Sequence, residues 1–490
     1  MPNKSPSTDT EEKPPVQTDP SIIRSACPAD ETIDDLLSKD AILTPDQIKQ
    51  EQLPSKWEKW VKGAIIGITG AIIMAAVFTG FFGSLAKDIP KEPLGKPWLW
   101  GMAFYGAVYY CAMGWRIWLW LKYRPAAAVD DEDLPSVSVI IPAFNEGRFV
   151  KNAIHSAAHS NYPGKKLQVI VVDDGSTDDT WYFIKKTASR SPIRVETIRQ
   201  PVNKGKKHAM YAGFKRATGK ILVTIDSDSI VARDAIRNGV APFVRDKSVG
   251  VVAGCVKVLN RNESVITRLL KVEFSLSFSF ARSYQSEIRG LLTVPGALAF
   301  YRASAVRPVL KKWLNQTFLK APCLIGEDRS MTNLIYAQGF NSSFQSNAVV
   351  WTKVPPRYRG MTKMFLRWAR SNVRETVILM SFIFTPFRRS HLWGFRINSL
   401  LVTLSLVAPY FLIFYGYILL SFAAPHWALR HAVIILLTSL PLAAIYYTAE
   451  KDTDFVWVIA YGFFWVLSCQ WIIPYAFLTC RRQGAWLTRG

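Results

Sequence analysis

The sequence has few cysteines and none arranged as a close pair. Its 490 residues include six cysteines, and no two of them form a CxxC motif. This pattern argues against a disulfide framework and against a zinc site. A signal peptide is also not expected, because the first apolar run begins only at Gly63, later than the layout of such a peptide allows.

Motifs for nucleotide or nucleic-acid binding are missing as well. Neither GxxxxGK[ST] nor GxGxxG occurs, which argues against a P-loop and a dinucleotide-binding domain. No zinc-finger, homeodomain or RNP pattern accompanies the net charge of +23, and the arginines are spread along the chain. We therefore expect no nucleic-acid partner. The charge then indicates attraction to anionic lipid or binding of a pyrophosphate-bearing donor.

What the sequence does contain is a mixed composition. Hydrophobic residues make up 49% of the chain and aromatic residues 13%, yet 20% of the residues are charged. This combination predicts a soluble domain inserted into a membrane bundle. Residues 1–58 are rich in Pro, Ser, Thr, Asp and Glu, so we expect a disordered cytosolic tail with a short helix near Pro45–Gln52.

Apolar runs lie on both sides of a central region. Residues 59–124 predict two transmembrane helices, at Gly63–Ala86 and Pro97–Leu121. Residues 361–390 predict interfacial amphipathic helices, because the apolar run Thr376–Phe387 is too short to span a bilayer.

Residues 391–480 predict about three more spans before a tail at 481–490: Asn398–Ala423, Ala432–Thr448 and Phe455–Cys480. The positive-inside rule places the strongly basic central region in the cytosol. Five crossings would then put the C-terminal arginines outside, against the same rule. A sixth crossing or a re-entrant segment would remove this conflict.

Residues 134–360 have the pattern of an α/β domain. The runs SVSVIIPAFNE, LQVIVVDDGSTDDT, KILVTIDSDS and VGVVAGCVKV are short and β-branched, and helix-like stretches separate them. Near-continuous apolar runs are typical of buried parallel strands. Ligands bind at the carboxyl ends of such strands, where three of these runs end in acidic or polar residues.

Two acidic motifs follow strands. Asp174 in VIVVDDGS can accept hydrogen bonds from a ribose or a uracil N–H, although a β-turn with a helix cap explains the pattern equally well. Asp226 and Asp228 are two positions apart, so their carboxylates point to one side and repel each other unless a cation lies beside them. Carboxylate oxygens suit Mg²⁺ or Mn²⁺, which would neutralise a leaving diphosphate.

Three further segments carry charge. Lys206 in NKGKKHAM follows a glycine and can contact phosphate, although a solvated basic loop also fits. In CLIGEDRSMTN, an acidic pair beside an arginine forms either a helix-start cap or a site whose carboxylate deprotonates an acceptor hydroxyl.

The third segment, MFLRWARSNVRE, places Arg367, Arg370 and Arg374 on one helical face. Arginine can clamp a diphosphate, and Trp368 can stack on a sugar ring. The alternative is a basic amphipathic helix at the lipid headgroups.

The ordered set DDGSTD, DSD, GEDR and RW, flanked by apolar spans, resembles the processive inverting glycosyltransferases. These include hyaluronan synthases, chitin synthases and rhizobial chitin-oligosaccharide synthases, and more distantly cellulose synthase. The resemblance covers residues 134–376, and GEDRSMTN and LRWARSNVRE are most similar to the hyaluronan and chitin-oligosaccharide branch. It implies an α/β GT-A domain with a mostly parallel sheet, inserted between N- and C-terminal transmembrane helices.

The resemblance also implies roles for the candidate residues. Asp328 would be the general base, with Glu327 and Arg329 beside it in the catalytic site, and Asp228 would bind Mg²⁺ or Mn²⁺. The donor-binding residues would be Pro142, Glu146, Asp174, Lys206, Asp226, Arg367 and Trp368. Cys323 stands where this branch carries a cysteine close to the site. ARSYQS and VPGALAFYR are similar to its acceptor-side segments.

Two positions depart from the pattern of the branch. Met364 stands where the QxxRW motif begins with glutamine, so a hydrogen bond to the donor or acceptor is lost and retention of a growing chain is weakened. Glu327 replaces the usual aspartate of the hyaluronan synthases, as it does in the chitin-oligosaccharide enzymes.

The implied function is that of a polysaccharide synthase, multi-pass in the cell membrane, with its catalytic domain in the cytosol. It would transfer sugar from UDP-GlcNAc, UDP-GlcA or both to a growing chain, with inversion and export of the polymer. One alternative is non-processive transfer of a single sugar to a lipid acceptor. A second is a non-catalytic membrane receptor or scaffold, against which the complete acidic set argues.

Overall fold

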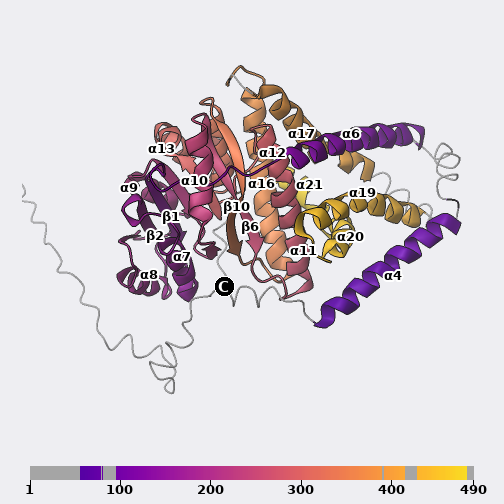
Figure 1. Ribbon diagram of the computed structural model, residues 1–490. Coiled ribbons are helices and arrows are strands. Elements are labelled where there is room, and N and C mark those ends of the chain that lie inside the picture. The colour runs from indigo at the N-terminus through magenta and orange to yellow at the C-terminus, as the bar shows by residue number, and fades with distance from the viewer. Residues whose placement is uncertain (1–55, 79, 81–94, 389–390, 414–426, 483–490) are drawn as a thin grey trace, which may run out of the picture. The chain divides into compact units, whose positions relative to one another are not determined.

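The computed structural model describes residues 56–482 except 79, 81–94, 389–390 and 414–426 (Figure 1). The short helix expected at Pro45–Gln52 and nearly all of the expected N-terminal tail lie outside the described residues. The same holds for most of the expected C-terminal tail.

An eight-stranded sheet lies at the centre of the described chain, with the strand order β3-β2-β1-β4-β7-β6-β10-β5 (Figure 1). The strands are β1 Val137–Ala143, β2 Leu167–Asp173, β3 Val195–Arg199, β4 Ile221–Ile225, β5 Ser229–Val231, β6 Val249–Val258, β7 Leu298–Arg302 and β10 Asn341–Thr352. β1 pairs in parallel with β2 and β4, and β6 pairs in parallel with β10. β7 runs antiparallel between β4 and β6, and β5 runs antiparallel to β10.

This pairing confirms the expected α/β domain with a mostly parallel sheet. Because β2, β4, β6 and β10 run in the same direction, their carboxyl ends lie at one edge. The polar residues that follow these strands are therefore brought to the same side of the domain.

Helices cover both faces of the sheet, which is why its strands read as apolar runs. The helices of the domain are α7 Val150–Ala158, α8 Thr180–Ser189, α9 Lys206–Arg216, α10 Ala235–Arg245, α11 Val265–Ser275, α12 Ser283–Glu287, α13 Ala303–Val306, α14 Leu310–Leu314 and α15 Glu327–Tyr336. α9 packs on β1 and β2, and α10 packs on β6 and β10. Gly213 lets α9 approach β1 closely, since a Cβ there would lie 2.4 Å from Cγ2 of Ile140.

The RW segment lies in one long helix, α16 Tyr358–Phe382. The separate interfacial helix expected at Thr376–Phe387 is instead the last part of α16, which ends at Phe382. The physical reason is packing, because Met361, Phe365 and Val373 repeat along one buried face of the helix. This face packs α16 against α15 and α21.

The apolar helices are α4 Lys56–Phe78, α6 Gly95–Lys122, α17 Leu392–Ile413, α19 Trp427–Glu450, α20 Phe455–Phe464 and α21 Ile472–Leu478. Within the described residues, two stretches are long and apolar enough to cross a membrane, Trp57–Phe78 and Ala428–Glu450. A third is possible only if Phe455–Cys469 and Ile472–Leu478, bent by 41°, form a single span.

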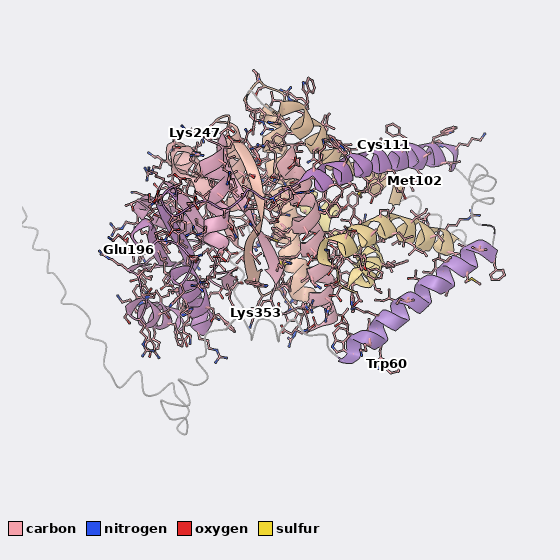
Figure 2. The ribbon with its side chains drawn as sticks, viewed as in Figure 1. Trp60, Met102, Cys111, Glu196, Lys247 and Lys353 are labelled. Carbon is pink, nitrogen blue, oxygen red and sulfur yellow. The ribbon has the colours of Figure 1, made fainter. Side chains whose placement is uncertain are left out.

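Fewer described helices therefore qualify than the five spans expected. α6 contains Lys96, Arg116 and Lys122 among its aromatic residues, which lowers its hydropathy. The expected span Asn398–Ala423 continues past the end of α17 into residues outside the described part. Side chains such as Trp60 on α4 and Cys111 on α6 are exposed on these helices (Figure 2).

A buried group of charges joins α4 to the rest of the chain. Arg268 of α11 is 1% exposed, and its guanidinium donates to Glu58 of α4 and, over 3.0 Å, to Asp454 between α19 and α20. Lys62 pairs with Glu58 at 2.5 Å and with Asp454 at 2.7 Å. The pairing explains why charged residues occur in an otherwise apolar helix, because each buried charge has an opposite partner.

Candidate active site

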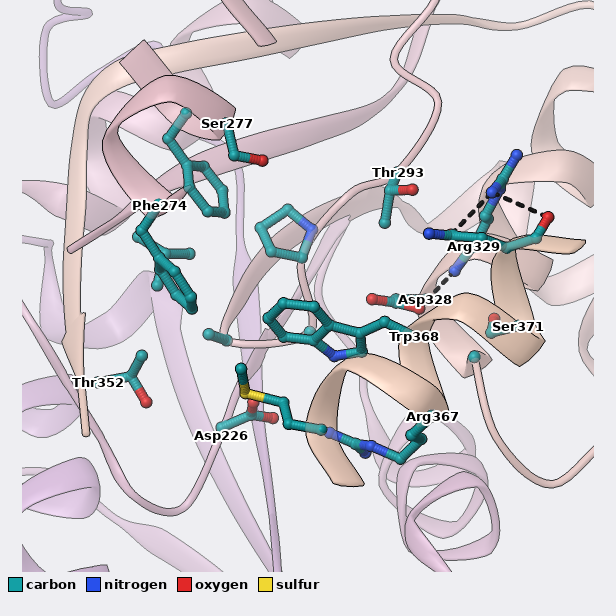
Figure 3. A pocket seen from close by; sticks show the side chains of 18 of the residues that line it. Asp226, Phe274, Ser277, Thr293, Asp328, Arg329, Thr352, Arg367, Trp368 and Ser371 are labelled. Atoms are coloured by element: carbon teal, nitrogen blue, oxygen red, sulfur yellow. Dashed lines mark hydrogen bonds between the residues drawn. The ribbon is translucent and has the colours of Figure 1, made fainter. Parts of the chain in front are cut away.

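A cavity of about 430 Å³ brings together the motif segments that the sequence singles out (Figure 3). Its wall contains Lys206 at the start of α9, Asp226 and Asp228 after β4, and the Gly326–Arg329 segment at the start of α15. α16 contributes Met364, Arg367 and Trp368. These segments are far apart in the sequence, and the fold brings them together around one cavity, as expected.

Asp226 and Asp228 lie on the turn between β4 and β5. Asp226 accepts a hydrogen bond from Nζ of Lys206 at 2.6 Å, and Asp228 accepts one from Oγ1 of Thr352, at the end of β10, at 3.2 Å. Burial raises the pKa of Asp226 and the charge of Asp228 adds to this, while Lys206 opposes both. The two carboxylates are therefore close enough to repel each other, as their spacing predicts.

Lys206 bridges two acidic residues from different segments. Its Nζ also pairs with Oε1 of Glu327 at 3.0 Å. Burial disfavours the ammonium, but the charges of Asp226 and Glu327 outweigh this and raise the pKa of Lys206. The lysine therefore stays charged in the cavity wall and joins the DSD motif to the GEDR motif.

The backbone before Asp328 has a conformation that requires glycine. Gly326 has φ +74°, and a Cβ there would lie 1.7 Å from Oγ of Ser371 in α16. α15 begins at the next residue, so Glu327 and Asp328 lie in its first turn. Nε1 of Trp313 donates to the carbonyl oxygen of Glu327 at 2.9 Å and holds this turn in place.

The pKa values of the adjacent carboxyl groups of Glu327 and Asp328 are shifted in opposite directions. Burial alone would raise the pKa of Glu327, but the charges of Lys206 and Arg367 lower it to about 2. Burial and the charge of Glu327 raise the pKa of Asp328 to about 6. A pair of carboxyl groups whose pKa values are pushed apart is typical of acid–base sites, and Asp328 has the value suited to a general base near neutral pH.

Arg329 lies in the cavity wall but is bound to α16. Its guanidinium, labelled in Figure 3, donates to Oδ1 of Asn372 at 2.8 Å and to Oγ1 of Thr376 at 2.8 Å. The residue is 4% exposed. These bonds fix the first turn of α15 on α16, so the arginine positions Asp328.

The three arginines expected on one face of α16 have different environments. Arg367 lines the cavity, and its buried Nε has no hydrogen-bond partner among the described residues. Arg370 donates to Oγ1 of Thr479, the residue that follows α21, at 3.0 Å. Arg374 is buried and donates to the carbonyl oxygen of Ile325. Of the three, Arg367 faces the cavity and is placed to meet a ligand there.

Three expected donor-binding residues lie at the sheet edge but not in the cavity wall. Asp174 accepts hydrogen bonds from the backbone N–H groups of Lys204 and Gly205, at 3.1 and 2.7 Å, so it shapes the loop that precedes Lys206. Burial raises its pKa. Pro142 pairs with Val172 inside the sheet, and Glu146 is buried with 8% of its surface exposed.

The structure also places residues in the cavity that the sequence motifs did not indicate. Side chains of α11 and of the π-helix η4 Leu276–Arg282 line it, among them Glu273, Phe274 and Ser277. A signal for them exists, because EFSLSFSFAR repeats polar and aromatic residues at a spacing of four. Cys323, expected close to the site, is buried, and its carbonyl oxygen accepts a bond from Lys207 at 2.8 Å.

The carboxylates of the DSD motif fit a divalent cation chemically. Oxygen ligands on a cavity wall suit Mg²⁺ or Mn²⁺, which often take phosphate oxygens and water as further ligands. Within the described residues no group of three or more His, Cys, Asp and Glu side chains could hold a metal. A cation at Asp228 would therefore need ligands from a bound donor.

Known proteins resemble the chain over most of its length. The model of glycosyl transferase family 2 matches residues 138–310. An N-acetylglucosaminyltransferase of Rhizobium meliloti (strain 1021) is 30% identical over 368 residues, which are 74% of this chain and 84% of that protein. An N-acetylglucosaminyltransferase of Neorhizobium galegae is 28% identical over 367 residues, covering 74% of this chain and 82% of that protein.

A solved structure shares the fold. The mannosyltransferase PcManGT from Pyrobaculum calidifontis, in complex with GDP-Man and Mn²⁺, aligns with a TM-score of 0.54 at 22% sequence identity. The alignment covers 76% of this chain and 98% of the mannosyltransferase. This likeness confirms the expected GT-A-like α/β fold.

Proposed function

The chain belongs to glycosyl transferase family 2, and we propose that it is a membrane polysaccharide synthase that uses a UDP-sugar donor. Membership of the family and the similarity to N-acetylglucosaminyltransferases identify it as a hexosyltransferase. The names of these relatives favour UDP-GlcNAc as the donor, and the resemblance to hyaluronan synthases adds UDP-GlcA as a second candidate donor.

One observation carries the mechanism: Asp328 shares a cavity with Asp226 and Asp228 and with the cationic side chains of Lys206 and Arg367. Asp328 acts as the general base and accepts the proton of an acceptor hydroxyl. The hydroxyl oxygen forms a bond to the anomeric carbon while the bond to the diphosphate oxygen breaks on the opposite face, so the configuration is inverted. Lys206 and Arg367 stabilise the negative charge that collects on the leaving UDP.

The second aspartate of the DSD motif would hold the metal ion. Mg²⁺ or Mn²⁺ on Asp228 supplies Lewis-acid stabilisation of the diphosphate when it is bound. Asp226 and Trp368 would bind the donor sugar, and Asp174 would contact the uridine through the loop that it shapes. Pro142 and Glu146, at the same sheet edge, would support the uridine end of the site from outside the cavity.

The membrane assignment rests on the apolar helices and on charge. α4 and α19 are long and apolar enough to cross a bilayer, and the net charge of +23 favours the cytosol for the catalytic domain. We propose a multi-pass protein of the cell membrane, with the domain at residues 134–360 between the two sets of apolar helices. Export of the growing chain through these helices completes the proposal.

A donor panel tests the function directly. Purified protein would be given UDP-GlcNAc, UDP-GlcA, both together, or other UDP-sugars, with Mn²⁺, with Mg²⁺ or with EDTA. We expect UDP release and an acid-insoluble polymer only with divalent metal, and loss of both in the Asp328→Asn variant. Glu196→Gln, which removes a half-buried carboxylate on the edge strand β3 (Figure 2), is the matched control and should keep full activity. Unchanged UDP release by Asp328→Asn would contradict the mechanism.

Transfer of a single sugar to a lipid acceptor is the second candidate. Met364 favours it, because its thioether lines the cavity where an amide would hydrogen-bond a chain. Product size separates the two functions. High-mass polysaccharide supports the synthase, and an organic-extractable monosaccharide lipid supports the alternative.

A further inference from the structure

Two consecutive lysines begin helix α9, and the proposed mechanism uses only the first of them. The second, Lys207, is 1% exposed and, unlike Lys206, does not belong to the cavity wall. Its Nζ donates to the carbonyl oxygen of Cys323 at 2.8 Å and lies 5.2 Å from the centre of the Trp313 ring. The buried amine therefore binds the chain that leads to the first turn of α15.

Burying an ammonium group at this place costs stability. Burial lowers the pKa of Lys207 to about 8, although electrostatic interactions with Cys323, Glu375 and Glu327 oppose the shift. The hydrogen bond of Lys207 goes to a neutral carbonyl group, which offsets the cost of burial less fully than a carboxylate partner would. A buried charge that is kept at such a cost indicates a role other than filling the core.

The segment that Lys207 binds, residues 323–327, is fixed by its backbone. Three of its carbonyl oxygens, at every second residue, accept hydrogen bonds from side chains on three different helices. These bonds join Cys323 to Lys207 of α9, Ile325 to Arg374 of α16 and Glu327 to Trp313 of α14. The three donor side chains are all at most 1% exposed. The backbone immediately before Asp328 is therefore held from three sides.

The first turn of α9 binds this segment at both ends. Lys206 pairs with Glu327, the last residue of the segment, at 3.0 Å, and Lys207 binds the carbonyl oxygen of the first residue at 2.8 Å. The loop before α9 is held in turn by Asp174, which accepts two backbone N–H bonds from it. Contacts therefore lead without a break from this loop through α9 to the backbone before Asp328.

We propose that Lys207 is a positioning residue, which fixes the backbone at residues 323–327 so that Asp328 keeps its place relative to the donor-binding residues. It acts through the carbonyl group of Cys323 and touches no substrate. Loss of this bond displaces Asp328 but leaves Lys206 in the donor site, and a small displacement of a catalytic group can lower the rate about 100-fold. The inference rests on the proposed function, because it takes Asp328 as the general base.

Lys207→Met removes the ammonium group but keeps an unbranched side chain against Trp313. Hydrogen–deuterium exchange at residues 323–328, measured on the whole protein in detergent, should become at least about tenfold faster, because the segment loses one of its bonds. The value of kcat should fall at least about tenfold, while the KM for the UDP-sugar should stay within about twofold of wild type. Lys206→Met should instead raise that KM, so the two adjacent lysines should differ in effect.

Three further variants serve as controls. Lys215→Met, at an exposed position of the same helix, should change neither the exchange rate nor kcat. Lys207→Arg keeps a cation that can donate to the carbonyl oxygen of Cys323, so it should recover most of the kcat lost in Lys207→Met. Trp313→Phe removes another of the three donors but keeps a ring. The losses in kcat of Trp313→Phe and Lys207→Met should not multiply in the double variant, because both bonds fix one segment.

The outcomes distinguish this inference from the function itself. Wild-type protein that releases no UDP from any UDP-sugar would contradict the proposed function, and the exchange rates would still show whether Lys207 holds the segment. Unchanged exchange at residues 323–328 in Lys207→Met with a wild-type melting temperature would overturn the inference alone. The same is true if kcat is unchanged, or if the KM for the donor rises by as large a factor as kcat falls. Lys207→Gln, whose side chain is one atom shorter, would replace Lys207→Met if that variant did not fold.

Discussion

At the scale of single residues, the protonation state of Asp328, the proposed general base, should set the pH range in which transfer occurs. Its pKa is raised to about 6 by burial and by the charge of Glu327. A general base must be deprotonated, so kcat/KM should fall as the pH drops below about 6 and level off above it. Asp328→Asn should lower kcat by at least about 100-fold. The pH–rate profile with a saturating acceptor measures the first effect, and single-turnover UDP release measures the second.

Lys206 gives a second prediction, because its charge lowers the pKa of Asp328. Lys206→Met removes that charge, so the acid limb of the pH profile should move to higher pH. The KM for the UDP-sugar should also rise, because the variant lacks the cation that we propose to stabilise the diphosphate.

The control for Lys206 is the exposed Lys215 on the same helix α9. Lys215→Met should keep the wild-type pH profile and donor KM. An unshifted profile in Lys206→Met would show that the bridge to Asp226 and Glu327 does not govern the base.

At the scale of elements, the start of α15 depends on a close contact with α16. A Cβ at Gly326 would lie 1.7 Å from Oγ of Ser371, and the backbone there has φ +74°. Gly326→Ala should lower the free energy of unfolding by about 2 kcal/mol or more and abolish transfer, because Asp328 is displaced. Melting temperature and UDP release would be measured together.

A variant at Gly339, which follows α15, is the control that distinguishes the effect of backbone strain from the effect of the steric clash. It has φ +91°, but a Cβ there would meet only the carbonyl oxygen of Phe387, at 3.1 Å. Gly339→Ala should therefore cost less stability and leave transfer active. Equal losses in the two variants would show that the contact with Ser371 is unimportant.

At the scale of the whole molecule, a buried charge cluster holds the N-terminal apolar helix on the catalytic domain. Arg268→Met would remove the buried guanidinium that pairs with both Glu58 and Asp454 and would leave Lys62 as the cation that they share. Removing one member of such a group typically costs about 3–5 kcal/mol. We expect a lower melting temperature and faster proteolysis between α4 and the domain.

The ion pair between the exposed Arg216 and the half-buried Glu196 provides the comparison. Arg216→Met should change the free energy of unfolding by less than about 1 kcal/mol, because exposed ion pairs contribute little. The double variant Glu58→Gln and Arg268→Met should recover part of the stability lost by Arg268→Met alone. No recovery would show that Arg268 acts by packing and not by charge.

The sequence by itself determined the features that are local. Apolar β-branched runs specify buried strands, and a carboxylate directly after a strand must lie at its carboxyl end, so the place of Asp226 and Asp228 followed from pattern alone. The glycine before Glu327 and the RW segment were visible in the same way. The α/β domain, its mostly parallel sheet and its transferase chemistry could therefore be predicted.

Only the tertiary structure decided which distant side chains meet. Arg329 binds Asn372 of α16, Asp174 shapes a loop, and Lys206 joins two motifs about a hundred residues apart. Glu273, Phe274 and Ser277, which line the cavity from α11 and η4, stayed unassigned for the same reason, because the sequence does not show which surface a helical face meets. Sequence spacing sets the direction of a side chain on its own element, whereas packing between elements sets what it touches.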